Sequence, residues 1–277
     1  MSDHYLPVGN SGPAVVTPES AGWRYSGLRI LELPAGGRFQ LDTGPSEYAV
    51  LSLSGSCSIS VENRSYDIAG RESVFTGVSD FLYVPRDTTA MIESPSGGRF
   101  ALPSTRCDRR LEVRYGAAAD VPVEVRGAGQ ATRQVNNFLA PDAFPAEKLC
   151  AVEVLTPGGN WSSYPPHKHD EDRPGEAVLE EIYYFETKGL AYQRVYGPDI
   201  DVQAEISTGD IVLIPYGYHG PSMAAPGYDL YYLNVLGGPG EKRSMAFCDD
   251  PKHAWIRGSW DGVPIDPRVP FFEGVGR

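Results

Sequence analysis

The chain has 277 residues, 41% of them hydrophobic and 22% charged, and its 36 acidic and 24 basic residues give a formal net charge of −12. This composition is typical of a globular protein with room for two domains. The acidic balance and the lack of a long basic run exclude nucleic acid and an anionic membrane surface as expected partners.

The sequence also carries signals about its cellular compartment. The four cysteines, Cys57, Cys107, Cys150 and Cys248, are widely spaced and form no Cys-x-x-Cys motif. The N-terminus lacks the charged and apolar regions of a secretion signal, and no apolar run reaches the roughly 18 residues of a membrane-spanning helix. We therefore expect a cytoplasmic protein with free, mostly buried thiols.

Short strands and tight turns are the predicted elements of the first half. Gly (31 residues), Pro (24) and Tyr (16) are abundant, while helical periodicity is scarce. In chain order, a Pro-Ala-Gly-Gly turn at 34–37 precedes a strand that starts at Glu47 and turns at Gly55. A second strand, 81–84, ends in a turn at Pro85, and residues 107–136 alternate as strand segments broken by glycines.

The second half repeats this order. A Pro-Gly-Gly turn lies at 157–159, a strand starts at Glu181 and turns at Gly189, and a strand over 211–214 ends at Pro215. Unequal spacing between these blocks indicates a duplicated module rather than a short solenoid repeat. The tail from 248 to 277, rich in proline and aromatic residues, is expected to wrap the barrel or a neighbouring subunit as an extended segment.

Histidines occur at these positions in the second half alone. His167 and His169 alternate along one strand, so both side chains point to the same face. His219 follows the Pro215 turn, where the first half has Thr89. With Glu181 they form a set that suits one divalent first-row ion, namely Zn, Fe, Mn, Co or Ni, with positions left for substrate.

Two adjacent carboxylates compete for the fourth ligand position. Glu180 and Glu181 point to opposite faces of one strand, so only one of them can face the histidines. Glu181 shares its face with Tyr183, and the Glu47-to-Gly55 spacing of the first half matches Glu181-to-Gly189. Both observations predict Glu181 as the ligand.

The motifs resemble those of cupins. Gly159…His167-x-His169…Glu181…Gly189 and Gly209-x5-Pro215-x-Gly217-x-His219 follow the two cupin motifs, although eleven residues separate His169 from Glu181. The resemblance implies an all-β bicupin of two β-barrel (jelly-roll) domains. Residues 1–135 would form a degenerate N-terminal cupin without metal ligands, and residues 136–277 a metal-binding C-terminal cupin with the wrapping tail.

A more specific resemblance covers about residues 20–265. The stretches 164–170, 179–185 and 215–221, together with 133–139 and 249–255, look like the 5-deoxy-glucuronate isomerase family of myo-inositol catabolism. The long gap after His169 favours this family over the sister 5-keto-4-deoxyuronate isomerases of pectin breakdown. It implies a metal-dependent aldose–ketose isomerase that converts 5-deoxy-D-glucuronate to 5-dehydro-2-deoxy-D-gluconate.

Further pocket residues are predicted on weaker grounds. Tyr183 shares the face of Glu181 and is a candidate base, next to a metal-bound hydroxide or a carboxylate. Asn234 occupies a position where cupins often place an inward polar residue. Arg133 and Lys148 are candidate ligands of the substrate carboxylate.

Other functions remain open at this stage. The ligand set also suits a cupin dioxygenase or oxidase, because one fold hosts many chemistries. A non-catalytic sugar-acid binding bicupin is the alternative from a different class. The expected partner is a small deoxy-uronate, and the tail and the ligand-free half make a homo-oligomer conceivable.

Overall fold

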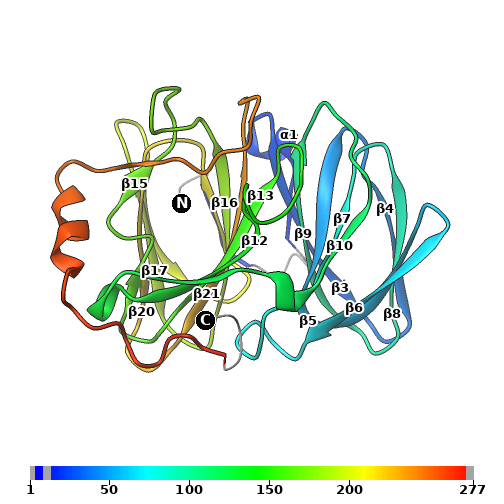
Figure 1. Cartoon of the computed structure of the whole chain (residues 1–277), viewed down its shortest axis with the longest axis horizontal. Coiled ribbons are helices and arrows are strands. Elements are labelled where there is room, and N and C mark those ends of the chain that lie inside the picture. Colours follow the sequence, from blue (N-terminus) through cyan, green and yellow to red (C-terminus); the bar gives the residue numbers. More distant parts are fainter. Residues whose placement is uncertain (1–3, 9–13, 273–277) are drawn as a thin grey trace.

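The structure is a computed structural model of the chain that describes residues 4–8 and 14–272. Two β-barrels stand side by side, the N-terminal half in blue and cyan and the C-terminal half in green and yellow (Figure 1). The described helices are α1 (Pro18–Ala21) and three 3-10 turns, η1 (Ala118–Asp120), η2 (Gly129–Ala131) and η3 (Ala254–Trp260). None of them has the length and hydropathy to cross a membrane.

One nine-stranded sheet curls into the N-terminal barrel. Its main path runs through β10 (Arg114–Gly116), β7 (Phe81–Val84), β5 (Ser46–Val61), β9 (Gly98–Arg106), β3 (Ser26–Leu33) and β2 (Val15–Val16), and β4 (Gly37–Asp42), β6 (Arg64–Arg71) and β8 (Thr89–Ser94) complete it. The predicted turn at Gly55 is wrong. Strand β5 continues through it, and Gly55, with a φ of 82°, lies where the pairing register shifts. Glycine adopts this left-handed conformation without strain, so the strand can bend between the two layers.

The C-terminal barrel consists of two sheets. A seven-stranded sheet contains β1 (Tyr5–Leu6), β19 (Ile211–Ile214), β16 (Glu180–Thr187), β21 (Leu230–Gly237), β13 (Cys150–Thr156), β12 (Arg133–Leu139) and β11 (Val123–Arg126). A six-stranded sheet contains β18 (Asp201–Ile206), β17 (Ala191–Tyr196), β20 (Tyr218–Ala224), β15 (His167–Lys168), β22 (Cys248–Asp249) and β14 (Trp161–Ser162). All-β bicupin architecture is thus confirmed, with the described residues holding one His/Glu/His group, in the C-terminal half.

The chain passes between the barrels earlier than the sequence suggested. Strand β10 pairs with β7 of the N-terminal sheet, whereas β11 already pairs with β12 of the C-terminal sheet. The predicted boundary between residues 135 and 136 falls inside β12, and β1 from the N-terminus adds an edge strand to the C-terminal sheet. Sheet pairing therefore divides the chain between residues 116 and 123, apart from this exchanged strand.

Alternating side chains of β16 face two different cores. Ile182 and Tyr184 belong to the apolar cluster between the halves, which also contains Leu51 and Phe81 of the N-terminal barrel. Tyr183 belongs to the cluster inside the C-terminal barrel. The strand is buried on both faces for this reason, and it is the rigid element on which the site is built.

Reciprocal carboxylates join the two barrels. Glu47 accepts hydrogen bonds from the backbone N–H groups of residues 147, 148 and 149, at 2.5–2.9 Å. Glu180 accepts hydrogen bonds from the backbone N–H groups of residues 24, 25 and 26, at 2.7–2.9 Å. Each half thus provides a carboxylate that accepts hydrogen bonds from backbone N–H groups of the other half, at the start of β13 and of β3.

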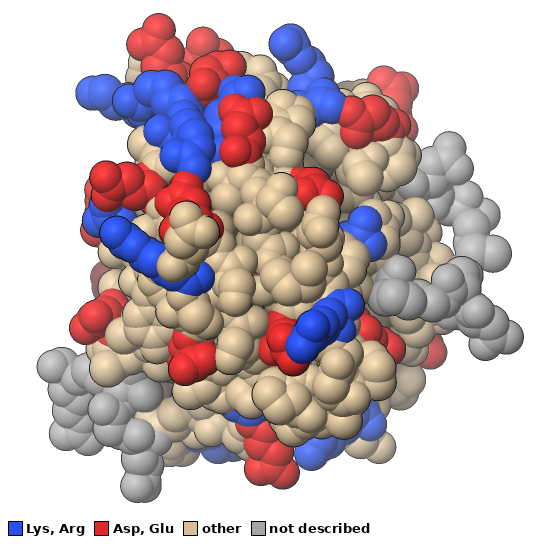
Figure 2. Space-filling view, turned by 90° about the vertical axis from the view of Figure 1, so that its right-hand side faces the viewer, with Lys and Arg blue, Asp and Glu red and all other residues tan. Residues whose placement is uncertain are grey.

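Charged side chains of both signs cover the outer face of the N-terminal barrel (Figure 2). They lie mostly toward the edges of this face, around a largely uncharged centre. The thiols are free, as predicted, with Cys57, Cys107 and Cys150 buried and Cys248 half-buried. The predicted extended tail is partly wrong, because residues 254–260 form the 3-10 turn η3.

Candidate metal centre

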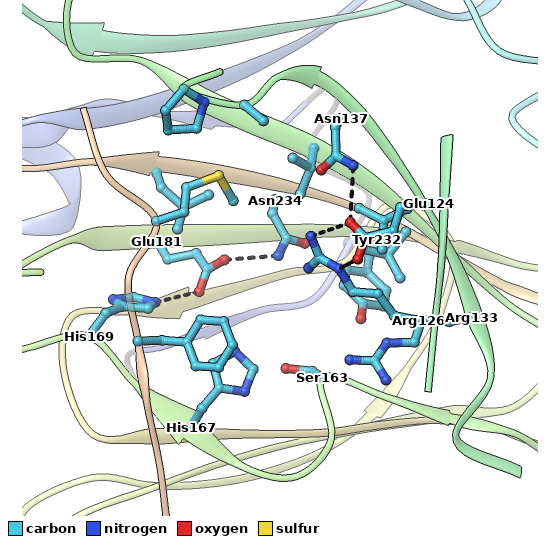
Figure 3. A pocket seen from close by; sticks show the side chains of 18 of the residues that line it. Glu124, Arg126, Arg133, Asn137, Ser163, His167, His169, Glu181, Tyr232 and Asn234 are labelled. Atoms are coloured by element: carbon cyan, nitrogen blue, oxygen red, sulfur yellow. Dashed lines mark hydrogen bonds and ion pairs between the residues drawn. The ribbon is translucent and has the colours of Figure 1, made fainter. Parts of the chain in front are cut away.

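Three strands, β15, β16 and β20, bring the predicted ligands together inside the C-terminal barrel. His167 lies in β15 directly opposite His219 in β20, and His169 follows β15 by one residue. Glu181 lies near the start of β16. Figure 3 shows His169 and Glu181 pointing toward each other, with His167 beside them at the cavity.

Three of these side chains form a compact buried group. The Nε2 atoms of His169 and His219 lie 2.9 Å and 3.1 Å from the same oxygen of Glu181. The ligand atoms of the three residues all lie within 4.8 Å of one another, which suits a common ion. His167 stands at the edge of the group, its ring centroid 4.4 Å from that of His219.

Hydrogen bonds fix the orientation of two imidazoles. His167 and His169 each donate from Nδ1 to a backbone carbonyl, of Pro165 and Leu179 respectively, at 3.1 Å. A carbonyl can only accept, so Nδ1 carries a proton in both rings and Nε2 is the nitrogen that would face a metal. In His169 this Nε2 contacts Glu181, whose carboxylate a bound ion would share. Among the described residues, neither buried ring nitrogen of His219 has a hydrogen-bond partner, although its Nε2 lies 3.1 Å from an oxygen of Glu181. An orphaned buried imidazole of this kind fits a metal ligand.

The protonation states of three of the four predicted ligands match a metal site. Burial lowers the pKa of His167 well below its ordinary value, and it lowers that of His219. Burial also opposes protonation of His169, but the Glu181 carboxylate outweighs it and raises the pKa of this imidazole. Burial opposes the ionisation of Glu181, but His219 and His169 outweigh it and hold the carboxyl pKa at about 2. Ionised carboxylate and neutral imidazole are the forms that bind a divalent ion.

Asn234 supports the carboxylate from the neighbouring strand. Its Nδ2 donates to the second oxygen of Glu181 at 2.9 Å, and its Oδ1 is buried without a partner. This bond orients Glu181 toward the histidines (Figure 3). Asn234 thus lines the same cavity, and its side chain bonds to a predicted metal ligand.

Glu180 faces away from this group, into the contact with the N-terminal barrel. The alternation of side chains along β16 therefore distinguished the two carboxylates correctly. The spacing comparison aligned the halves wrongly by one residue. Glu181 pairs with Ile214 just before Pro215, while in the first half Tyr48 pairs with Val84 just before Pro85. Glu47 is therefore the counterpart of Glu180.

A cavity of about 780 Å³ opens from the metal group. Arg133, the first residue of β12, lines this cavity and is only 6% exposed. Its guanidinium donates to the Ala131 carbonyl at 3.2 Å and lies 5.6 Å from the ring centroid of Trp260. Burial lowers the pKa of Arg133 to about 10, so it stays charged at neutral pH.

The two other predicted pocket residues differ in their placement. Tyr183 lines the cavity, shares a 3.0 Å hydrogen bond with Ser163 and stacks on Tyr232. Burial raises its pKa well above the ordinary value, which disfavours the tyrosinate that a base would require. Lys148 lines a different cavity, where its ammonium donates to the Gly240 carbonyl at 2.6 Å, so the structure does not bring it to the metal group.

Several cavity residues were missed by the sequence analysis. Phe247, Arg257 and Trp260 come from the C-terminal tail, and Arg126 comes from β11. The aromatic content of the tail was the available signal, but nothing in the sequence showed which barrel face the tail covers.

Comparison with known proteins adds an independent observation. The sequence profile of the KduI/IolB family matches residues 8–256. The chain is 41% identical over 249 residues to a protein of Geobacillus kaustophilus named 5-deoxy-glucuronate isomerase, with 87% of this chain and 89% of that protein covered. A Bacillus subtilis protein of the same name is 36% identical over 250 residues, with 87% and 91% covered.

Solved structures are similar as well. A crystal structure of an IolB-like protein from Salmonella typhimurium superposes with a TM-score of 0.85 at 34% identity, covering 92% of this chain and 99% of that one. Oxalate decarboxylase of Lactobacillus farciminis gives a TM-score of 0.64 at 14% identity, with 91% and 90% covered, and bears on the fold alone.

Proposed function

Because the chain belongs to the KduI/IolB family, we propose that it isomerises 5-deoxy-D-glucuronate to 5-dehydro-2-deoxy-D-gluconate. One observation carries the proposal: a single cavity is lined by His169 and Glu181 of the buried group and by Arg133. The substrate has an aldehyde at one end and a carboxylate at the other. Each end thus finds a chemically suited group within one cavity.

The ligand set of the proposed enzyme is His167, His169, Glu181 and His219, holding one divalent ion (Zn, Fe, Mn, Co or Ni). The fit rests on the ionised Glu181, the Nδ1 hydrogen bonds that leave Nε2 of His167 and His169 facing the group, and the orphaned nitrogens of His219. When bound, such an ion supplies Lewis-acid stabilisation for the enediolate of an aldose–ketose isomerisation.

The reaction itself moves two protons. One leaves C2 and is delivered to C1, and the hydroxyl proton of O2 ends on O1, so no oxidant or reductant is consumed. Tyr183, kept neutral by burial, is suited to donate a hydrogen bond to a substrate oxygen rather than to remove the C2 proton. Arg133 binds the substrate carboxylate and sets which end of the sugar acid reaches the histidines.

The test is a proton NMR assay of purified, metal-analysed protein under nitrogen. We expect the aldehyde of 5-deoxy-glucuronate to be converted without oxygen, and faster than the pectin-derived 5-keto-4-deoxyuronate. A requirement for oxygen would indicate an oxidase instead, and faster turnover of the pectin sugar would reassign the substrate. Cytoplasmic location and a homo-oligomeric state stay predictions.

A further inference from the structure

The C-terminal segment 247–260, here called the strap, closes one side of the cavity (orange to red in Figure 1). Its first part, β22, pairs with β15 so that Asp249 lies opposite His167. The backbone N–H of Asp250 donates to the Pro166 carbonyl at 2.8 Å, which anchors the strap beside the histidine strand. The 3-10 turn η3 then carries the chain to Trp260.

Trp260 contacts two arginines. The Cζ atoms of Arg133 and Arg257 each lie 5.6 Å from the centroid of its ring, within the range of a cation–π interaction. Such contacts are stronger where water is excluded, and Arg133 is 6% exposed. Trp260 therefore connects the strap with the guanidinium inside the cavity.

Arg133 differs from the other arginines of the cavity in its partners. Arg257 forms an ion pair with Asp249, and Arg126 with Glu124. Arg243 donates to backbone carbonyls, among them that of Leu149 at 2.7 Å. Among the described residues Arg133 has no ion pair, and its one hydrogen bond goes to the Ala131 carbonyl. Its charge is thus left for an anion, and the ring of Trp260 lies beside it.

Two neighbours confine the guanidinium of Arg133. Gly127, with a φ of 74°, approaches it so closely that a Cβ at this position would lie 2.8 Å from Nη1 of Arg133. The backbone on one side and the indole ring on the other therefore limit where the guanidinium can lie.

We propose that Trp260 is a positioning residue that sets specificity for sugar acids by holding Arg133 ready for the terminal carboxylate of the substrate. This role rests on the proposed function, in which Arg133 binds that carboxylate. A pre-positioned guanidinium spares the ordering cost that a mobile arginine would incur on binding.

The test compares Trp260→Leu with Trp260→Phe in the full-length, metal-loaded protein. Leucine fills space without a π face, whereas phenylalanine keeps one. With 5-deoxy-glucuronate we expect Trp260→Leu to raise KM about five- to thirty-fold with kcat within about two-fold, and Trp260→Phe to restore part of the loss. With 5-deoxyglucose, which ends in a hydroxymethyl group, all three proteins should show the same KM.

A double-mutant cycle separates positioning from packing. In an Arg133→Gln background, Trp260→Leu should raise KM less than about two-fold, because the residue through which it acts is gone. Trp255→Leu is the matched control, since Trp255 lies in the same turn but is 68% exposed. Equal KM increases for both sugars, or additive effects in the cycle, would overturn the proposal.

The outcome can be distinguished from a failure of the proposed function. If the wild-type protein does not turn over 5-deoxy-glucuronate, the isomerase assignment fails, and the same variants are compared by calorimetric Kd for the two sugars. A Kd ratio between the sugars that Trp260→Leu leaves unchanged overturns the positioning role. Absence of binding to either sugar overturns both.

Discussion

The adjacent carboxylates Glu180 and Glu181 offer the sharpest test of the site, because one change at each position should give opposite results. Glu181 lies between His169 and His219, whereas Glu180 accepts three backbone hydrogen bonds from the other barrel. Glutamine has nearly the same shape as glutamate but no charge. We therefore compare Glu181→Gln with Glu180→Gln.

The magnitudes follow from the contacts. Loss of residues that only orient a ligand typically costs 10- to 100-fold in metal affinity, so we expect Glu181→Gln to lose at least about 100-fold. Glu180→Gln replaces one accepting oxygen by a donor that faces backbone N–H groups. Hydrogen bonds to charged groups contribute about 1.5–3 kcal/mol each, and Glu180 is half-buried, so we expect a loss of about 2–4 kcal/mol in the free energy of unfolding.

Two measurements on each variant decide the question. Metal content and competition with a chromophoric chelator give the affinity, and urea unfolding of the metal-free protein gives stability. Glu180→Gln should bind metal like the wild type but unfold earlier. If Glu180→Gln loses the metal while Glu181→Gln keeps it, the proposed ligand set is wrong.

Three further outcomes are expected. Glu47→Ala should lower the free energy of unfolding by about 3–6 kcal/mol in urea titrations, since it leaves three buried N–H groups without an acceptor, and a loss below about 1 kcal/mol would contradict this. Asn234→Ala should weaken metal binding about 10- to 100-fold in chelator competition by freeing Glu181, and unchanged affinity would remove it from the site. Burial opposes ionisation of Glu176, but Lys168, the Asp170 N–H and Arg173 hold its pKa at about 2 against an ordinary 4.5. Its ionised form therefore stabilises the fold above about pH 4.5 and less as the pH falls toward 2, so the difference in urea midpoint between wild type and Glu176→Gln should shrink over this range.

Local alternation is the part of the site that the sequence predicts well. A strand residue and its neighbour face opposite sides whatever the register, so Glu181 and Glu180 were separated without knowledge of the partner strands. Register itself depends on pairing between distant segments. The sequence comparison placed the two halves one residue out of register, so it matched Glu47 with Glu181 when its structural counterpart is Glu180. Only the pairing of each strand with its Pro-terminated neighbour resolved this.

Long-range placement explains the remaining differences. Arg133 and Lys148 are both basic residues beside central strands, and nothing local indicates which of the two cavities each one lines. Trp260 reaches the site through a tail whose course is set by pairing at β22 and by the Asp249–Arg257 ion pair. These contacts join segments far apart in the chain, which periodicity cannot detect.

The eleven residues between His169 and Glu181 would separate the two ligands if they were a free loop, and Glu176 explains why they do not. Its buried carboxylate accepts from the Lys168 ammonium at 2.9 Å and from the Asp170 N–H at 3.0 Å, and it pairs with Arg173. The segment thereby folds back on its own start. Leu179 then lies beside His169, donating its N–H to the His169 carbonyl and accepting from the imidazole Nδ1. The insertion that departs from the usual spacing therefore supplies the hydrogen bond that fixes the orientation of a proposed ligand.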